Sequence, residues 1–563
     1  MKFQYFQWPK DKKKIVKYYK SVDKSKIIDK MKYILPSAIN KDYINAAEKI
    51  IRDDIYMIPP YGSTSYPKSI NWTEDPKNTR SFMRLLHGHF FINDLVAAYK
   101  KSKKVEYLLK GFEIIKDWIL NNPYNNPAHK MAWHDETTAS RLMTWISFFN
   151  EARKLLNDNE SELFLKSIFL HVKLLSSSNF YSKNTNHGMF QDQALIIYSD
   201  YFWEFNNSKN INKLACSRMK EYFDFIFSSE GIHLEHSPKY HQMIAQYLKK
   251  YGDYLNSVNS PFSKELINLY NKASKFATYI IKPDGYLPQI GDTDRLRARS
   301  GIWINNPYYR YAVTKGREGR VPLENDKVFP KSGYAIFRDD WQKKEKGVYI
   351  LFIAAYHVAY HKHCDDLSLW IYSNGDIIRE SGPNGFDYKN KFTRYTYSSF
   401  SHNTLIVDNK SLPRTDGKYK SVRLTEYKVD KNISRVTGIN ERFEGVKHIR
   451  TVEYFKDTKN ITITDNIKSE KEHEYKLLWN LADDIKPVIK GTKILLYRGK
   501  VLVMRVSIET NTKFSIRTIR GQVKPFVLGW ICEKFCQQKP TSALIIGFTG
   551  RNVSIKTKFT IMN

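Results

Sequence analysis

The chain has 563 residues, of which 42% are hydrophobic and 14% aromatic. This composition excludes an intrinsically disordered protein, and the length exceeds one ordinary core, so we expect at least two domains. The 91 Lys and Arg residues outnumber the 58 Asp and Glu residues, and the formal charge of +33 favours an acidic partner. The four cysteines are too few for a disulfide framework.

The first half of the chain has the sequence pattern of packed helices. Residues 1–70 are predicted to form an N-terminal arm with one helix over 38–54. Beyond residue 81, apolar residues recur every three or four positions, most clearly over 104–122, 162–178, 212–229 and 264–282. Many antiparallel helices in succession predict an α-toroid or α-solenoid, and the absence of a fixed repeat period disfavours a helical repeat array.

The second half of the chain has the pattern of strands. From residues 327–341 onward, alternating and β-branched runs dominate, and turn residues recur every eight to fifteen positions. This spacing is typical of an antiparallel β-sandwich. We therefore predict an arm over 1–70, a helical domain over 71–325 and a β-sandwich domain over 326–563.

Two imidazoles and a carboxylate in the β-rich half form a candidate metal site. His363, Glu380 and His402 offer the ligand set that suits a divalent ion, zinc above all. His361 and His363 alternate, so on a strand both would point to one side, and His361 would be left to face a substrate. The alternative is an exposed polar strand at 361–363 with His402 capping a turn.

Three further groups of residues are candidates for a site. Asn186 and His187 precede an apolar helical segment, and Tyr240 and His241 follow a proline at the expected start of a helix. The alternative for these is a helix-capping residue and a half-buried aromatic side chain.

Trp133, His134 and Arg141 fall in one predicted helix over 131–145. Trp133 and Arg141 share a face of that helix, where one could stack on a sugar and the other pair with a carboxylate or sulfate. The alternative places Trp133 in the core and pairs Arg141 with a carboxylate of its own helix. We interpret Asp292 and Asp294, in QIGDTDR, as turn residues rather than as a calcium loop.

Taken together, these segments resemble the heparinase II/III-like polysaccharide lyases and the related alginate lyases. The resemblance runs from about residue 70 to at least residue 410. It implies an N-terminal incomplete (α/α) toroid followed by a C-terminal antiparallel β-sandwich, with the active cleft between them. Members cleave uronic-acid-containing polysaccharides by β-elimination. The segments that carry it are INWTEDP, RSFMRLLHGHFF, MAWHDETTASRLMTW, NHGMFQDQAL, SPKYH, GDTD, FPKSGY, HKHCDDLSL and SHNTLIVD.

The resemblance also implies roles for individual residues. Asn186 and His361 match the residues that neutralise the uronate carboxylate. Tyr240 matches the general acid, which is also the base for one C5 stereochemistry, and His187 matches the base for the other epimer. Independently of the resemblance, we count Trp133, His134, Arg141 and His241 as candidate substrate contacts. The implied metal ligands are His363, Glu380 and His402, which would hold a structural or site-organising ion.

Two positions depart from the family pattern. Many relatives have Asp where this chain has Glu380, a longer side chain that can still coordinate a metal. The heparinase II branch uses an acidic residue three positions after the histidine of the helical motif, and here that position is Phe190. The departures bear on the identity of the substrate, either a glycosaminoglycan-like polymer or a bacterial capsular polysaccharide.

The competing hypothesis is a non-catalytic or repurposed glycan-binding protein of capsule or O-antigen polysaccharide biosynthesis. It is motivated by the N-terminus, MKFQYFQWPKDKKK, which has neither the apolar core nor the cleavage site of a signal peptide. We expect a bacterial protein that is cytoplasmic by sequence, with the periplasm or export by a non-standard route as alternatives. We also expect no membrane span and no nucleic-acid partner, and a homo-oligomer stays an open alternative.

Overall fold

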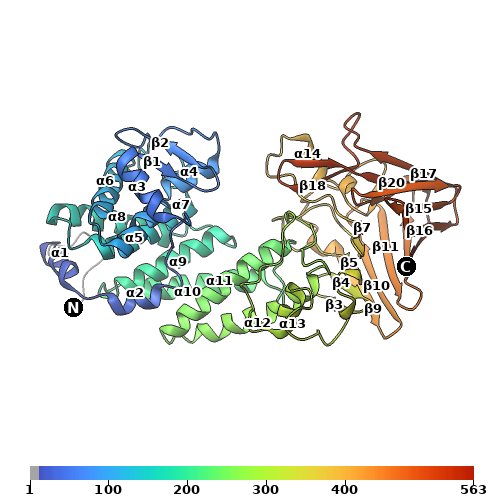
Figure 1. Ribbon diagram of the computed structural model, residues 1–563, viewed down its shortest axis with the longest axis horizontal. Coiled ribbons are helices and arrows are strands. Elements are labelled where there is room, and N and C mark those ends of the chain that lie inside the picture. Colours follow the sequence, from blue (N-terminus) through green and yellow to red (C-terminus); the bar gives the residue numbers. More distant parts are fainter. Residues whose placement is uncertain (1–11, 563) are drawn as a thin grey trace. The chain divides into compact units, whose positions relative to one another are not determined.

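The computed structural model describes residues 12–562, with helices first along the chain and strands last (Figure 1). The chain divides into two compact units. The helical unit contains Met1–Phe225 and Lys250–Leu266, and the β-rich unit contains Ile226–Lys249 and Ile267–Asn563. Residues 1–11, on which most of the signal-peptide expectation rests, lie outside the described part.

The helical unit is built from amphipathic helices around one nearly enclosed helix, α7. Fifteen of the 18 residues of α7 are buried, and it packs against α5, α8 and α9. Local signals set the helix ends: Asn157 and Glu160 form a capping box at the start of α8. The helices are α1 Lys12–Ser21, α2 Ser25–Met31, α3 Tyr43–Asp53, α4 Arg80–His87, α5 Ile92–Ser102, α6 Glu106–Asn121, α7 Asp135–Ala152, α8 Asp158–Ser176, α9 Asn186–Tyr201 and α10 Ser208–Ile226.

Within the described residues, the β-rich unit contains three larger antiparallel sheets. One is β3 Lys327–Phe329, β4 Tyr334–Arg338, β5 Val348–Ile353, β6 Ser368–Ser373 and β7 Asp376–Ile378, in that order. The second has the order β17 Phe514–Arg520, β20 Ser542–Gly550, β13 His473–Asn480 and β8 Leu405–Val407. The third has the order β14 Ile485–Lys490, β15 Lys493–Arg498, β16 Val501–Thr510, β21 Val553–Ile561, β12 Asn460–Ser469, β11 Val446–Phe455, β10 Ile433–Asn440 and β9 Val422–Val429.

These sheets share one hydrophobic core. Buried residues alternate with partly exposed ones along β11 and with mostly exposed ones along β21, as in strands with one face on a core. Apolar side chains from all three sheets join in a single cluster, which includes Phe352, Val452 and Leu544. Smaller elements of the unit are α13 Pro307–Val313, α14 Lys391–Tyr397 and the hairpin of β18 Trp530–Lys534 and β19 Gln537–Pro540. The predicted fold class, a helical toroid followed by an antiparallel β-sandwich, is confirmed.

The predicted helical segments are found as α6, α8, α10 and α12 Phe262–Ile280, and the predicted helix over 38–54 is found as α3. Helices α1 and α2 were not predicted, because their Lys-rich sequences hide short apolar stripes. The predicted helix over 131–145 begins only at Asp135, so Trp133 and His134 precede it. Among the helices of the described residues, none combines the length and apolar character that a membrane crossing requires.

Candidate active site and metal centre

The segment that carries His361 and His363 is a loop between β5 and β6, not a strand. His361 has φ +53° and Leu367 has φ +58°, and such left-handed backbone conformations interrupt a strand. The prediction that the two histidines alternate along a strand is therefore wrong in its geometry. Both side chains nevertheless meet at one carboxylate, that of Asp292.

Asp292 is a buried carboxylate that joins three side chains. Its Oδ2 accepts from Nδ1 of His361 at 2.7 Å, and its Oδ1 accepts from Nε2 of His363 at 3.1 Å. Tyr397 donates its hydroxyl to the same Oδ1 at 2.9 Å. Burial raises the pKa of Asp292, but the hydrogen bonds from the two histidines outweigh burial and hold that pKa well below its usual range. Asp292 is therefore an anion that orients both rings.

Gly291 lets this carboxylate approach the histidine loop. The residue has φ +50°, and a Cβ there would lie 2.5 Å from the carbonyl oxygen of His236 and 2.9 Å from that of His361. No other residue fits without moving the backbone. The sequence prediction of a turn at QIGDTDR is borne out by the turn at 291–292. The role of Asp292 was missed, because its partners lie about 70 positions away in the sequence.

Tyr240 lies in the first turn of α11 Pro238–Ser257, where the sequence predicts the start of a helix. Its ring stacks on the imidazole of His361 with centroids 3.7 Å apart and an interplanar angle of 24°. Burial, and then the charge of Asp292, raise the pKa of the phenol. A phenol in this field stays protonated, so Tyr240 is suited to donate a proton.

His241 and Arg141, two of the predicted substrate contacts, are buried. His241 accepts from the backbone N–H of His233 at 3.2 Å, donates to the carbonyl of Ala273 at 3.0 Å, and has a pKa lowered by burial to about 4. Arg141 is 0% exposed and donates to His171 and to the carbonyls of His87 and Ala132. Its guanidinium also stacks on Trp118 at 3.8 Å.

The physical reason for the burial of Arg141 is the position of α7. Since that helix is enclosed on nearly all sides, its Arg141 face packs against other helices rather than against solvent. Among the described residues, Arg141 pairs with no carboxylate; two carbonyls and the neutral His171 ring accept from its Nε and Nη1, while its Nη2 has no hydrogen bond. A contact of Arg141 or His241 with a substrate would require a surface position that this structure does not give them.

The Asn186–His187 pair forms the first turn of α9, and Thr185 caps that helix by accepting from the N–H of Gly188 at 3.2 Å. Among the described residues, no hydrogen bond reaches the side chain of Asn186. Its amide is partly exposed and stays available to a ligand. Thr185 rather than Asn186 therefore caps the helix, so the alternative of Asn186 as the N-cap residue is not borne out.

His187 lies between two carboxylates. Its Nδ1 is 3.1 Å from Oδ1 of Asp135, and its Nε2 is 3.2 Å from Oε2 of Glu136. Arg84 in turn pairs with Glu136 at 2.5 Å. Burial lowers the pKa of His187, but the hydrogen bond to Asp135 and the charge of Glu136 outweigh burial and raise that pKa above its ordinary value. The imidazole is thus biased toward its protonated form.

His134 and Trp133 are partly exposed beside this pair. His134 lies at the N-cap of α7, with Nδ1 at 2.6 Å from Oδ1 of Asp135 and Nε2 at 2.6 Å from a guanidinium nitrogen of Arg80. Trp133 donates its indole N–H to the carbonyl of Asn122 at 3.0 Å. Both keep surface that a ligand could contact.

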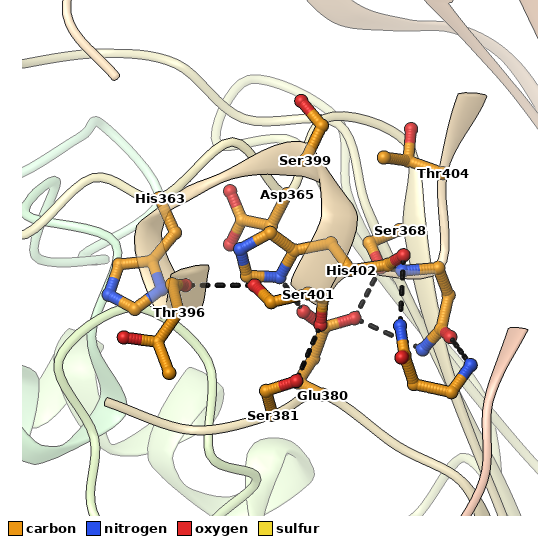
Figure 2. A network of polar contacts seen from close by, with 12 residues as sticks. His363, Asp365, Ser368, Glu380, Ser381, Thr396, Ser399, Ser401, His402 and Thr404 are labelled. Carbon is orange, nitrogen blue, oxygen red and sulfur yellow. Dashed lines mark hydrogen bonds and ion pairs between the residues drawn. The ribbon is translucent and has the colours of Figure 1, made fainter. Parts of the chain in front are cut away.

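The predicted metal ligands His363, Glu380 and His402 are buried neighbours (Figure 2). Figure 2 shows the Glu380 carboxylate in contact with Nδ1 of His402, with Ser368 donating to the same carboxylate. The ring centroids of His363 and His402 are 5.5 Å apart. Burial lowers the pKa of His402, but the charges of Glu380 and Asp365 and the Glu380 contact outweigh burial and raise it.

One atom in this cluster is left without a partner. Nε2 of His402 is buried and has no hydrogen bond among the described residues. A buried imidazole nitrogen without a partner is costly, and a metal ion would satisfy it. The donor set of two imidazoles and a carboxylate therefore fits a divalent ion. Asp365 is also close enough to interact electrostatically with both His363 and His402.

A second group could also hold a metal ion. Within 12–562, only His134, Asp135 and His187 bring three ligand atoms within 4.8 Å of one another. The set of His363, Glu380 and His402 does not meet this distance limit, and Nε2 of His363 contacts Asp292 instead. Of the described residues, His134, Asp135 and His187 thus form the group with the spacing of metal ligands.

Two exposed aromatic residues near His361 were missed by the sequence analysis. Phe386 is 48% exposed, lies 6.4 Å from the ring of His361, and packs edge-to-face on Phe535 at 5.2 Å. Phe535 is 36% exposed at the turn of the β18–β19 hairpin. The buried amide of Asn384 ties the two segments together by accepting from Gln538 at 2.5 Å and donating to Thr393 at 3.0 Å. The only feature of the sequence that could have indicated them is that each is an aromatic residue within a polar turn.

Comparison with known proteins finds similarity along most of the chain. The family model for the heparinase II/III N-terminus matches residues 3–311, and that for the heparinase II/III-like C-terminal domain matches residues 321–560. A heparin-sulfate lyase of Pedobacter heparinus is 22% identical over 523 residues, covering 86% of this chain and 76% of its own. One of Bacteroides stercoris is 22% identical over 479 residues, covering 79% and 70%.

Solved structures show the same fold. The crystal structure of a mutant heparan sulfate lyase from Pedobacter heparinus matches with a TM-score of 0.74 at 18% identity. The match covers 98% of this chain and 88% of that one.

Proposed function

Because the chain belongs to the heparinase II/III family, we propose that it is a polysaccharide lyase that cleaves a uronic-acid-containing, glycosaminoglycan-type polysaccharide by β-elimination. The observation that carries the proposal is the stacking of Tyr240 on His361, whose Nδ1 is fixed by Asp292. This pair places a proton donor against a ring with one nitrogen left for a substrate. The +33 formal charge suits an acidic polymer.

The chemistry explains the residue types. A base removes the proton from C5 of the uronate, the released electron pair forms the C4=C5 bond, and the C4–O4 bond breaks. The departing O4 then takes a proton. The C5 proton becomes acidic only when the neighbouring carboxylate is neutralised, so the site must also offset that charge.

We assign these steps to the predicted residues. Asn186 and His361 neutralise the carboxylate, and Tyr240 protonates O4, a role supported by its raised pKa. His187 takes the C5 proton of one epimer. Trp133 and His134 remain candidate substrate contacts because they are partly exposed. The buried Arg141 and His241 are left out of the proposal.

Two further proposals concern the organisation of the chain. We propose domain boundaries near residues 70 and 325, the second supported by the start of β3 at Lys327.

We also propose that His363, Glu380 and His402 hold a divalent ion. The ion would supply a fixed charge that organises the loops around Asp292, while the residues named above move the protons. Homo-oligomer formation and the compartment stay predictions.

The activity test is direct. Purified protein is mixed separately with heparan sulfate, hyaluronan, chondroitin, alginate and uronate-bearing capsular polymers, and the ultraviolet absorbance of the unsaturated product is followed. We expect a rise with at least one polymer. Binding without product on every polymer would contradict the proposal and favour the glycan-binding alternative.

We expect Asp135→Asn to move the pH profile of cleavage. Asp135 helps to raise the pKa of His187, so removing its charge lowers that pKa and leaves the imidazole neutral at more acidic pH. The acidic limb of kcat/KM should therefore move to lower pH on substrates whose epimer uses His187. The profile is measured with a chelator present, so that a metal ion at Asp135 does not contribute.

The opposite or no displacement of the acidic limb would remove His187 as the base. Asp224→Asn, at an exposed carboxylate paired with Lys220 rather than with His187, serves as the matched control.

We expect Phe386→Ala to weaken substrate binding without slowing the chemical step. A stacking contact worth roughly 0.5–1.5 kcal/mol corresponds to about a 2- to 12-fold rise in KM. Steady-state kinetics on a cleaved polymer give KM and kcat separately. Tyr427→Ala, another exposed aromatic residue at the edge strand β9, should leave both unchanged. A fall in kcat with KM unchanged would contradict a binding role for Phe386.

A further inference from the structure

Glu235 is a buried carboxylate without a hydrogen-bond partner. It lies in the segment between α10 and α11 and is 5% exposed. Its Oε2 is 3.6 Å from Nε2 of His361 and 3.8 Å from Nε2 of His233, both beyond hydrogen-bonding distance. Among the described residues, no hydrogen bond reaches this carboxylate. Since a buried carboxylate is costly unless it is paired, this one needs an explanation.

The geometry of His361 gives Glu235 a place in the proposed reaction. Nδ1 of His361 is bound to Asp292 at 2.7 Å, and the ring stacks on Tyr240. Nε2 is therefore the polar edge left for a uronate carboxylate, and Glu235 lies at that edge. A ligand oxygen bound to Nε2 would come close to the Glu235 carboxyl group.

Two adjacent anions would work against the reaction. Two like charges at close range in a site shielded from water repel each other far more strongly than they would in bulk water. An ionised Glu235 would thus oppose the neutralisation for which His361 is placed. A neutral carboxylic acid at the same position would donate a short, charge-assisted hydrogen bond instead.

The groups that face Glu235 favour the neutral acid. Burial raises the pKa of Glu235, and the charge of Asp292 raises it further. The charge of His361 lowers this pKa but does not outweigh burial, so the pKa lies above its ordinary value. His233 is buried with both ring nitrogens unpartnered, and burial holds its pKa well below the ordinary value. His233 is therefore neutral and supplies no charge to keep Glu235 ionised. Tyr240, the fourth facing group, is a neutral phenol.

We infer that Glu235 is a further catalytic residue, which in its neutral form donates a hydrogen bond to the substrate uronate carboxylate beside Nε2 of His361. The inference rests on the proposed lyase function. Glu235 keeps its proton throughout, so the bonds that form and break in the elimination are unchanged. Its contribution is to stabilise the charge that builds on the carboxylate as the C5 proton leaves, as other apolar sites do with a protonated carboxylic acid.

The protonation state can be tested without any substrate. Difference infrared spectra of wild-type protein and Glu235→Gln at neutral pH should show the loss of a carboxylic-acid carbonyl band. Glu444→Gln, at an exposed glutamate of the same unit, should lose carboxylate bands instead. Loss of carboxylate bands in Glu235→Gln would mean that Glu235 is ionised, and would overturn the inference even if the protein is a lyase.

Kinetics then test the role. Glu235→Gln keeps an N–H donor, so we expect a modest loss of kcat and a weaker dependence of rate on pH. Glu235→Met keeps the volume but removes the donor, and its kcat should fall by about 10²–10³-fold, the usual cost of losing one such donor. On a methyl-esterified polymer, which carries no carboxylate charge, Glu235→Met should lose less.

The outcomes separate the two proposals. If Glu235→Gln is as slow as Glu235→Met while Glu235→Asp stays active, Glu235 acts as a base and the inference is wrong. Thermal melts show whether each variant folds. If wild-type protein cleaves no polymer, the lyase proposal fails and the catalytic role fails with it, whereas the infrared result still decides the protonation state.

Discussion

Tyr240→Phe should lower kcat by about 10²–10⁴-fold, the usual contribution of a positioned proton donor. The substitution removes a hydroxyl that has no hydrogen bond among the described residues and keeps the ring that stacks on His361. We therefore expect the melting temperature to change little. Turnover is measured by product absorbance on a polymer that wild-type protein cleaves, and stability by thermal unfolding.

A control separates loss of this proton from loss of any buried phenol. Tyr454 is buried in the sandwich core, and its hydroxyl also has no hydrogen bond within residues 12–562. Tyr454→Phe should leave kcat unchanged. If Tyr240→Phe retained more than about half of the wild-type kcat, the proton that reaches O4 would have to come from another group, and the assignment of Tyr240 would be wrong.

The fold could be predicted because its elements are encoded locally. The three- and four-residue spacing of apolar side chains predicts α6, α8, α10 and α12, and the alternation along β11 is visible in the sequence. Periodicity gives less information where a helix is enclosed. In α7 nearly every side chain is buried. The prediction that Arg141 and Trp133 share a helix face therefore did not indicate whether Arg141 lies in the core or at the surface.

The candidate site was predicted only in part, because its contacts join distant segments. The resemblance to the family supplied Tyr240 and His361, but neither spacing nor composition indicates that Asp292 would bind His361 from 69 positions away. The carboxylates around His187 were missed for the same reason, since Asp135 lies 52 positions before it. Glu235 adjoins the recognised SPKYH segment, yet its importance follows from its position 3.6 Å from Nε2 of His361 and from the absence of a hydrogen-bond partner among the described residues.

His402→Ala should abolish retention of a divalent ion, zinc being the expected one. His402 combines a contact with Glu380 through Nδ1 and a buried Nε2 without a partner, so its ring has the most to gain from a metal. Purified wild-type protein should carry about one equivalent by elemental analysis. Because an ion that binds only the folded state stabilises it by about 2.7 kcal/mol at 100 times Kd, chelation should also lower the melting temperature.

The matched variant is His134→Ala, at the other group able to hold an ion. If the ion lies at His363, Glu380 and His402, His134→Ala keeps it and chelation still lowers the melting temperature of that variant. His402→Ala should then melt at one temperature with or without chelator. If His134→Ala loses the ion and His402→Ala keeps it, the ion lies beside His187, and Glu380 holds a charged histidine instead. Glu380→Gln would then destabilise the β-rich unit by leaving the buried imidazolium of His402 unpaired.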